Sequence, residues 1–154
     1  MAHPESLAAP RPALDALVRE LDVLIRARYP LIAVATFEEL RLRRILTAVA
    51  ELERHQPKGL YVWSRTRGLV QAAGPGLGPS ERPIPDTQDP ASALEYIAAA
   101  ERGLYVLCDF APYLAPFGYG QAEPLLVRRL RELAWQIKAR PVTVLLSLIH
   151  ISEH

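Results

Sequence analysis

The sequence predicts a three-layer α/β domain in which helices cover both faces of a parallel sheet of about four strands. Four short apolar runs, typical of strands that are buried on both faces, alternate with longer segments whose apolar residues recur every three or four positions. The chain has 154 residues, which is the size of one domain with a single sizeable core.

The elements follow one another in regular order along the chain. The runs that predict strands are residues 31–35, 60–63, 104–109 and 142–146. The predicted helices begin at Pro12, at Thr36 with Glu39 as its capping-box partner, at Asp89-Pro90, and near Glu123, the last running to Arg140. Between Gly68 and Pro90, glycines and prolines predict a mobile surface loop that buries almost nothing.

Composition excludes several classes of function. A net charge of +1 excludes bulk electrostatic attraction to nucleic acid or anionic lipid, so neither is expected as a partner. The single cysteine, Cys108, cannot form an internal disulfide or a zinc site, and its place in a predicted strand indicates a core residue. No apolar run has the length of a membrane helix and no signal-peptide pattern is present, so we expect a cytoplasmic protein.

A ligand of a parallel sheet binds where the carboxyl ends of the strands meet, and Asp109 ends the third predicted strand there. Many nucleoside-triphosphatases use such an aspartate to hold the magnesium ion that bridges the phosphates. An aspartate at the end of a strand is also common in α/β domains without activity. Both interpretations of Asp109 stay open from the sequence alone.

The loop that would cradle phosphates is absent from the sequence. Phosphate-binding loops of this kind place glycines and a Gly-Lys pair between the first strand and its helix. Here the corresponding segment is Thr36-Phe37-Glu38-Glu39, and no Gly-Lys pair occurs anywhere in the chain. The two carboxylates suit a helix N-terminus but repel phosphate, so ATP hydrolysis by this domain is not expected.

Other candidate sites are weak. Arg65 and Arg67, beside Trp63, are weak candidates for binding an anion, with ordinary surface arginines as the alternative. Two arginine triplets predict solvated helix faces, unless they form one stripe for nucleic acid; they are Arg41, Arg43 and Arg44, and Arg128, Arg129 and Arg131. No catalytic residues and no metal site are predicted, because His55 and the terminal histidines are not placed to act as a base.

Several segments together resemble the N-terminal region of a family of AAA-type ATPases from bacteria, cyanobacteria and chloroplasts, known from a conserved plastid reading frame. The resemblance covers about Leu21 to Leu145. The segments that carry it are Leu24 to Ile32, Thr36 with Glu38-Glu39, Leu60 to Ser64, Thr66 to Leu69, Asp89-Pro90 with Ala93-Leu94, Leu104 to Leu107 with Asp109-Phe110, and Val127 to Leu133.

The resemblance implies a P-loop NTPase-like domain, RecA/AAA-like in fold, that has lost its phosphate loop. It places Asp109 at a Walker-B-like position and residues 142–146 at a sensor-like strand. It also implies that the parent protein binds ATP and magnesium in a C-terminal AAA module missing here and forms a homo-oligomer. This part would bind no cofactor, and residues 12–145 would form the degenerate domain after a disordered segment 1–11.

The C-terminal segment is similar to a translated adapter sequence and not to a protein segment. Leu146 to Glu153 resembles, residue for residue, the translation of a transposon-end sequencing adapter. We therefore expect residues 146–154 to be read-through, the domain to be truncated, and one edge of its sheet to be left open.

Three functions follow as hypotheses. The first is a non-catalytic N-terminal domain of an AAA ATPase, serving interdomain packing, assembly or partner recognition. The alternatives are a stand-alone nucleotide-binding enzyme that uses Asp109 and magnesium, and a nucleic-acid adaptor that uses the arginine triplets.

Overall fold

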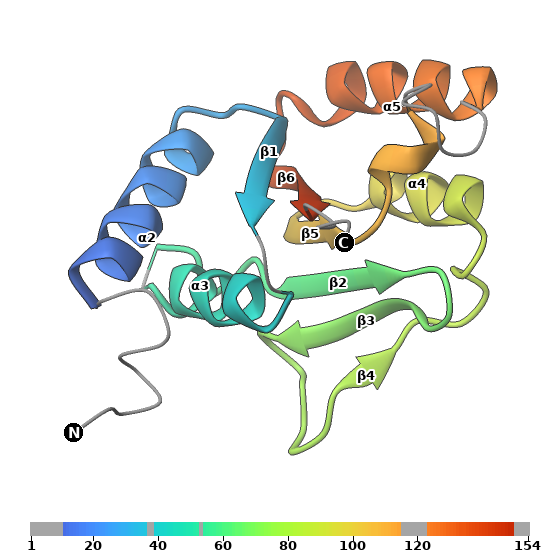
Figure 1. Ribbon diagram of the computed structural model, residues 1–154. Helices are drawn as coiled ribbons and strands as arrows, with labels where there is room; N and C mark the ends of the chain where they lie inside the picture. The colour runs from blue at the N-terminus through green and yellow to red at the C-terminus, as the bar shows by residue number, and fades with distance from the viewer. Residues whose placement is uncertain (1–10, 37–38, 53, 115–122, 150–154) are drawn as a thin grey trace, which may run out of the picture.

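A computed structural model describes residues 11–36, 39–52, 54–114 and 123–149 (Figure 1). The elements are α2 (Arg11–Arg26), β1 (Leu31–Thr36), α3 (Glu39–Glu51), β2 (Leu60–Ser64), β3 (Gly68–Ala73), β4 (Arg82–Pro83), α4 (Pro90–Ala99), β5 (Gly103–Leu107), the short 3-10 helix η1 (Ala111–Tyr113), α5 (Pro124–Ile137) and β6 (Val142–Ile149).

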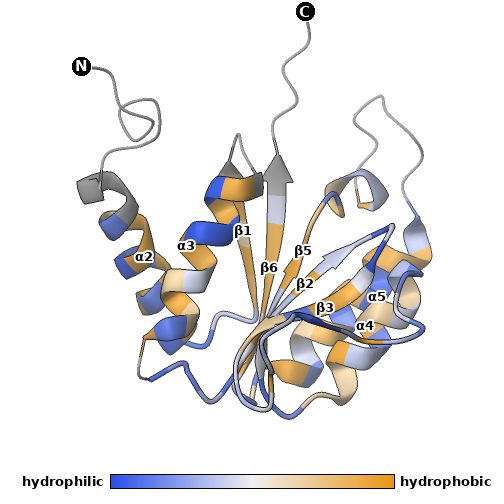
Figure 2. Cartoon of the chain, turned by 90° about the horizontal axis from the view of Figure 1, so that it is seen from below, coloured by the Kyte–Doolittle hydropathy of each residue, from blue (hydrophilic) through white to orange (hydrophobic). Residues whose placement is uncertain are grey.

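The strands form one mixed sheet in the order β1-β6-β5-β2-β3-β4. The four predicted strands, β1, β6, β5 and β2, are parallel to one another, whereas β3 pairs antiparallel with β2 and β4 pairs antiparallel with β3. Helices α2 and α3 lie on one face of the sheet and α4 and α5 on the other (Figure 2). The three-layer α/β fold is therefore confirmed.

Two apolar clusters, one on each face of the sheet, hold the layers together. The cluster between the sheet and helices α2 and α3 includes Ile25, Leu46 and Val106. The cluster between the sheet and helices α4 and α5 includes Trp63, Ile97 and Val144. Adjacent residues of a strand point to opposite faces, so each parallel strand contributes to both clusters. This arrangement explains why the strands are continuously apolar in sequence.

The expectation of a mobile loop between Gly68 and Pro90 is wrong for its first part. Gly68–Ala73 forms β3, paired antiparallel with β2, and Leu69, Val70 and Gln71 are buried. The Gly68 position demands glycine, because its φ is +72° and a Cβ there would lie 2.6 Å from Thr87 Oγ1. The segment thus extends the sheet instead of covering its surface.

The predicted start of α4 is confirmed. Asp89 caps the helix, with its carboxylate accepting from the main-chain N–H groups of Ala91 (3.1 Å) and Ser92 (3.3 Å), and Pro90 occupies the first turn. Helix α4 ends at Ala99, and Gly103 begins β5 with a φ of +140°.

Some expectations lie outside the described residues. These are the disorder of residues 1–10, the residue pair 37–38, and the capping box, because the side chains of Thr36 and Glu39 are not described. Helix α2 begins at Arg11, the last residue of the segment 1–11 that was expected to be disordered and one residue before the predicted start at Pro12. Residues Leu146 to Ile149 belong to β6 and pair with β1, and their origin as read-through stays a prediction.

Candidate functional site

A cavity of about 450 Å³ opens beside the carboxyl ends of β2 and β5, where a parallel sheet offers its ligand crevice. The cavity is lined by the first turns of α3, by β2 and β3 with the turn between them, and by Asp109, just after β5. The lining residues are Leu40, Arg43, Val62, Ser64, Thr66, Arg67, Val70 and Asp109.

Asp109 projects from a tightly held stretch of chain just after β5. The main-chain N–H of Cys108 donates to the carbonyl of Trp63 (3.0 Å), which continues the ladder with β2. Asp109 itself has a φ of +56° and is exposed, whereas the next residue, Phe110, is fully buried edge-on against Trp63 (5.5 Å). The left-handed conformation lets the carboxylate face the cavity while Phe110 anchors the turn.

The positive charges at the cavity are already paired. Glu81, from the β3–β4 connection, lies 2.5 Å from Arg43 Nη2 and 3.6 Å from Arg67 Nη2. The side chains of these three residues are between 36% and 55% exposed, so water screens both pairs. The two guanidinium groups therefore share the Glu81 carboxylate. Asp109 provides a second negative charge at the cavity.

The two predicted anion candidates do not act together. Arg67 lines the cavity, and its main-chain N–H donates to Ser64 Oγ (3.3 Å). Arg65 instead donates to the main-chain carbonyl of Gln88 (3.2 Å) and is not among the residues that line the cavity. The structure thus brings Arg67 and Asp109 to one cavity and gives Arg65 a contact to the segment before α4.

Comparison with known families agrees with this architecture. The family described as "SpoVK-like AAA ATPase, N-terminal domain" matches residues 17–152. The chain belongs to this family. A search of curated proteins and a search of solved structures each found no match.

As a member of this family, the chain is an N-terminal domain of an AAA ATPase, and such a domain implies a separate AAA module. Within the described residues, no three side chains of His, Cys, Asp or Glu come together as a metal ion requires. None of the helices in those ranges is both long enough and apolar enough to span a bilayer.

The two arginine triplets of this SpoVK-like domain lie on different layers. Arg41, Arg43 and Arg44 belong to α3, and Arg128, Arg129 and Arg131 belong to α5, across the sheet (Figure 2). Each triplet has at least one paired charge. In α3, Arg43 lies 2.5 Å from Glu81; in α5, Arg129 lies 3.0 Å from Glu95 and Arg128 lies 3.4 Å from Glu132. The triplets therefore do not form one basic stripe.

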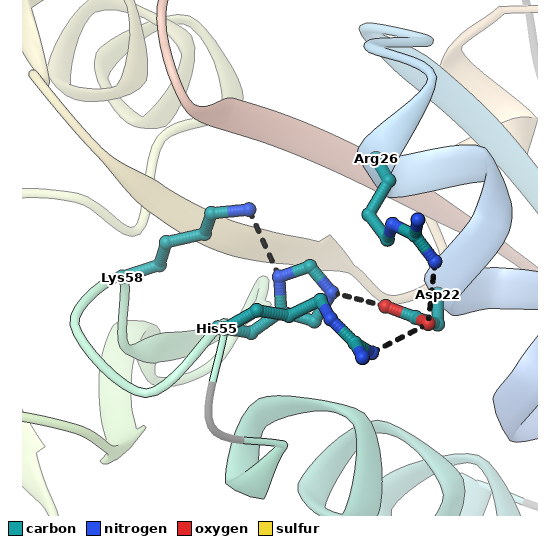
Figure 3. Close-up of polar contacts among 5 residues, drawn as sticks. Asp22, Arg26, His55 and Lys58 are labelled. Atoms are coloured by element: carbon teal, nitrogen blue, oxygen red, sulfur yellow. Dashed lines mark hydrogen bonds and ion pairs between the residues drawn. The ribbon is translucent and has the colours of Figure 1, made fainter.

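A cluster of charged side chains that the sequence did not indicate joins α2 to the turn before β2 (Figure 3). His55, 1% exposed, lies with Nε2 2.7 Å from Asp22 Oδ1, and Arg54 Nη1 lies 2.7 Å from Asp22 Oδ2. Lys58 Nζ lies 2.9 Å from His55 Nδ1, and Arg26 reaches Asp22 at 3.7 Å. We call these five residues the Asp22–His55 cluster.

The contacts fix the protonation of His55. A lysine ammonium has only donors, so Nδ1 of His55 must accept from Lys58, and the ring proton must sit on Nε2 and donate to Asp22. Burial, with the charges of Lys58 and Arg54, lowers the pKa of His55 against the opposing pull of Asp22. The imidazole is therefore neutral at pH 7 and serves as a bridge between Lys58 and Asp22.

The charges around His55 shift the pKa values of its partners too. Burial acts to raise the pKa of the Asp22 carboxyl, but the hydrogen bonds from His55 and Arg54 outweigh it and the net pKa is lowered. Burial and the charge of Arg28 lower the pKa of the Lys58 ammonium. All three shifts follow from bringing charged groups of α2 and the α3–β2 turn together in a partly buried place.

The sequence contained only a partial signal for the Asp22–His55 cluster. Asp22 falls outside the apolar stripe of the first helix, which predicts exposure, yet it is 7% exposed. The i, i+4 spacing of Asp22 and Arg26 is readable, but the contact with His55 spans 33 residues. It forms only when α2 packs against the turn.

Proposed function

We propose that this chain is a non-catalytic N-terminal domain that serves interdomain packing, assembly or partner recognition in an AAA ATPase. The parent protein binds and hydrolyses ATP with magnesium in its separate AAA module, and it forms a homo-oligomer. This domain needs no cofactor of its own.

One observation carries the proposal: Glu81 forms ion pairs with both arginines of the cavity at the carboxyl ends of the strands. A triphosphate entering there has to displace Glu81 and also meets Asp109, a second carboxylate. No Gly-Lys pair in the sequence supplies the amides and the ammonium that normally neutralise phosphates. The lining of this cavity does not fit a magnesium–triphosphate group.

Isothermal titration of the 154-residue chain with magnesium and ATP tests the proposal. We expect no saturable heat and no release of phosphate, either from this chain or from its Asp109→Asn variant. Saturable binding or ATP turnover that disappears in Asp109→Asn would overturn the proposal. That result would establish the alternative of a nucleotide-binding enzyme that uses Asp109 and magnesium.

The nucleic-acid alternative is tested separately by filter binding of duplex and single-stranded DNA and RNA. The arginine triplets lie on opposite faces of the sheet, so they cannot contact one strand together. We expect no affinity that falls with rising salt concentration. A steep salt dependence that weakens when Arg128 and Arg131 are both changed to alanine would support nucleic-acid binding.

A further inference from the structure

The two edges of the sheet differ in how they are protected. The β4 edge is two residues long and consists of Arg82 and Pro83, a charge and a residue without an N–H group. The β1 edge is six residues long, Leu31–Thr36, and contains no charged residue and no proline. Proteins normally shorten, charge or block an edge strand to prevent pairing with other chains. Only the β4 edge has these features.

Within the described residues, β6 is the single strand that pairs with β1. The N–H of Val144 donates to the carbonyl of Pro30 (2.8 Å), and Leu31 stands opposite Val144 in the parallel register. Main-chain groups alternate in direction along a strand, so the even-numbered residues of β1 face β6. The N–H and carbonyl groups of Leu31, Ala33 and Ala35 face the open edge.

A groove lies beside this edge. It has a volume of about 310 Å³ and is bounded by α2, β1 and α3. Most of its lining residues are apolar, and the charged ones are Glu20 and Arg41, of opposite sign; the apolar ones are Leu17, Leu21, Leu24, Ile32, Ala33, Val34, Ala35 and Ile45. A strand added at β1 would place every second side chain in this groove.

We infer that β1 is a pairing edge through which two copies of this chain join antiparallel into one continuous sheet. The outward main-chain groups set the register: Ala33 stands opposite Ala33 of the second copy, and Leu31 stands opposite its Ala35. This register gives three pairs that each exchange two main-chain hydrogen bonds. The inference goes beyond the proposed function and does not depend on it.

A second copy fits this edge by shape and by charge. In the inferred register, Ile32 faces Val34 of the second copy on the side of the groove, so apolar side chains from both copies meet there. On the other side of the sheet the central pair is Ala33 with Ala33, both exposed and small, so no bulky side chain blocks the approach. The groove has one charge of each sign, so two copies meet without net repulsion.

Six residues on each side bury much less surface than a standard stable interface, so the dimer is weak and depends on concentration. Sedimentation velocity of the 154-residue chain, from about 1 µM to about 100 µM, measures it, because weak complexes dissociate within such a range. We expect the weight-average mass to rise from monomer towards dimer. A chain that stays monomeric throughout overturns the inference.

The Ala33→Pro variant tests pairing at the β1 edge without removing a hydrogen bond of the sheet itself. The N–H of residue 33 faces outward, so proline there removes a donor from the edge and none from the β1–β6 ladder. We expect a folded monomer at every concentration, with an unchanged circular dichroism spectrum. The matched control, Ala139→Pro in the turn after α5, should dimerise like the unchanged chain. Dimerisation of Ala33→Pro equal to that of the control would overturn the inference.

A cross-link keeps the test decisive if Ala33→Pro fails to fold. A hydrogen-bonded antiparallel pair places its two Cα atoms about 5.5 Å apart, within the range a disulfide spans. Ala33→Cys should therefore form a disulfide-linked dimer on mild oxidation, and Ala139→Cys should not. Cys108 is buried and should not compete. Equal cross-linking of the two variants, or of neither, would overturn the pairing at Ala33.

Discussion

The two ends of the parallel strands differ in how deeply their charged side chains are buried. At the amino end of β2, Asp22 of α2 and His55 of the turn before β2 are buried, and every charge of the Asp22–His55 cluster has a close partner. At the carboxyl ends, Arg43, Glu81 and Arg67 form pairs that are exposed to solvent, beside an open cavity. Buried pairs are costly to break, whereas exposed pairs contribute little. The charges at the first end therefore contribute to the stability of the fold, whereas those at the second end stay accessible to solvent.

The largest expected effect comes from Asp22→Ala. This change leaves buried His55 without its acceptor and Arg54 without its carboxylate, so we expect a loss of about 3 kcal/mol in the free energy of unfolding. Urea denaturation measures the loss. Asp15→Ala, an exposed position on the same helix, is the control and should change the free energy by less than about 0.5 kcal/mol. Equal effects at both positions would contradict the comparison.

The second effect is a dependence on pH. Burial, with the charges of Lys58 and Arg54, lowers the pKa of His55 below its usual 6.5, so as pH falls the unfolded chain takes up this proton before the folded chain does. The contribution of His55 is therefore complete above pH 6.5 and declines as pH falls below it towards the folded pKa. The pKa of Asp22 is also lowered, from 3.8, so its contribution is lost only below pH 3.8.

Urea midpoints measured across the region just below pH 6.5 test this dependence. The His55→Gln variant lacks the titrating ring, so its midpoint should vary less with pH there than that of the unchanged chain. A slope that is equal in the two proteins would assign the dependence to other groups.

The smallest effect belongs to the carboxyl end. Glu81→Ala breaks both exposed ion pairs, and we expect a loss below about 1 kcal/mol because water screens them. Glu95→Ala, which breaks the exposed pair with Arg129 on the other face, is the matched control and should behave alike. If Glu81→Ala lowers the free energy of unfolding as much as Asp22→Ala does, the ion pairs at the carboxyl end contribute to stability as much as the Asp22–His55 cluster.

Most of the parallel core could be predicted from the sequence. Its strands are short, apolar and separated by helices with clear stripes and caps, and Asp89-Pro90 marks the start of α4 correctly. The hairpin of β3 and β4 could not be predicted, because nearby Gly74, Pro75 and Gly76 dominate the local pattern. What holds it is distant: Arg82 donates to Gln71 (2.5 Å), and Thr87 Oγ1 accepts from the N–H of Leu69 (2.8 Å).

The candidate site was predictable only in outline. The rule that ligands bind at the carboxyl ends of parallel strands led to Asp109 and Arg67, and both line the same cavity. Glu81 was not indicated, because it comes from the segment expected to be a mobile surface loop that buries almost nothing. The Asp22–His55 cluster was missed for a similar reason, since its partners meet only in the packed structure.

The placement of the two tryptophans gives the molecule separate optical reporters for its interior and its surface. Trp63 is fully buried, and its indole N–H donates to the carbonyl of Thr87 (2.7 Å), whereas Trp135 is 78% exposed on α5 with Lys138 Nζ 5.9 Å from its ring centre. A soluble quencher should reach Trp135 in the native state and Trp63 only after the sheet opens. Fluorescence thus distinguishes loss of the core from events confined to the outer side of α5.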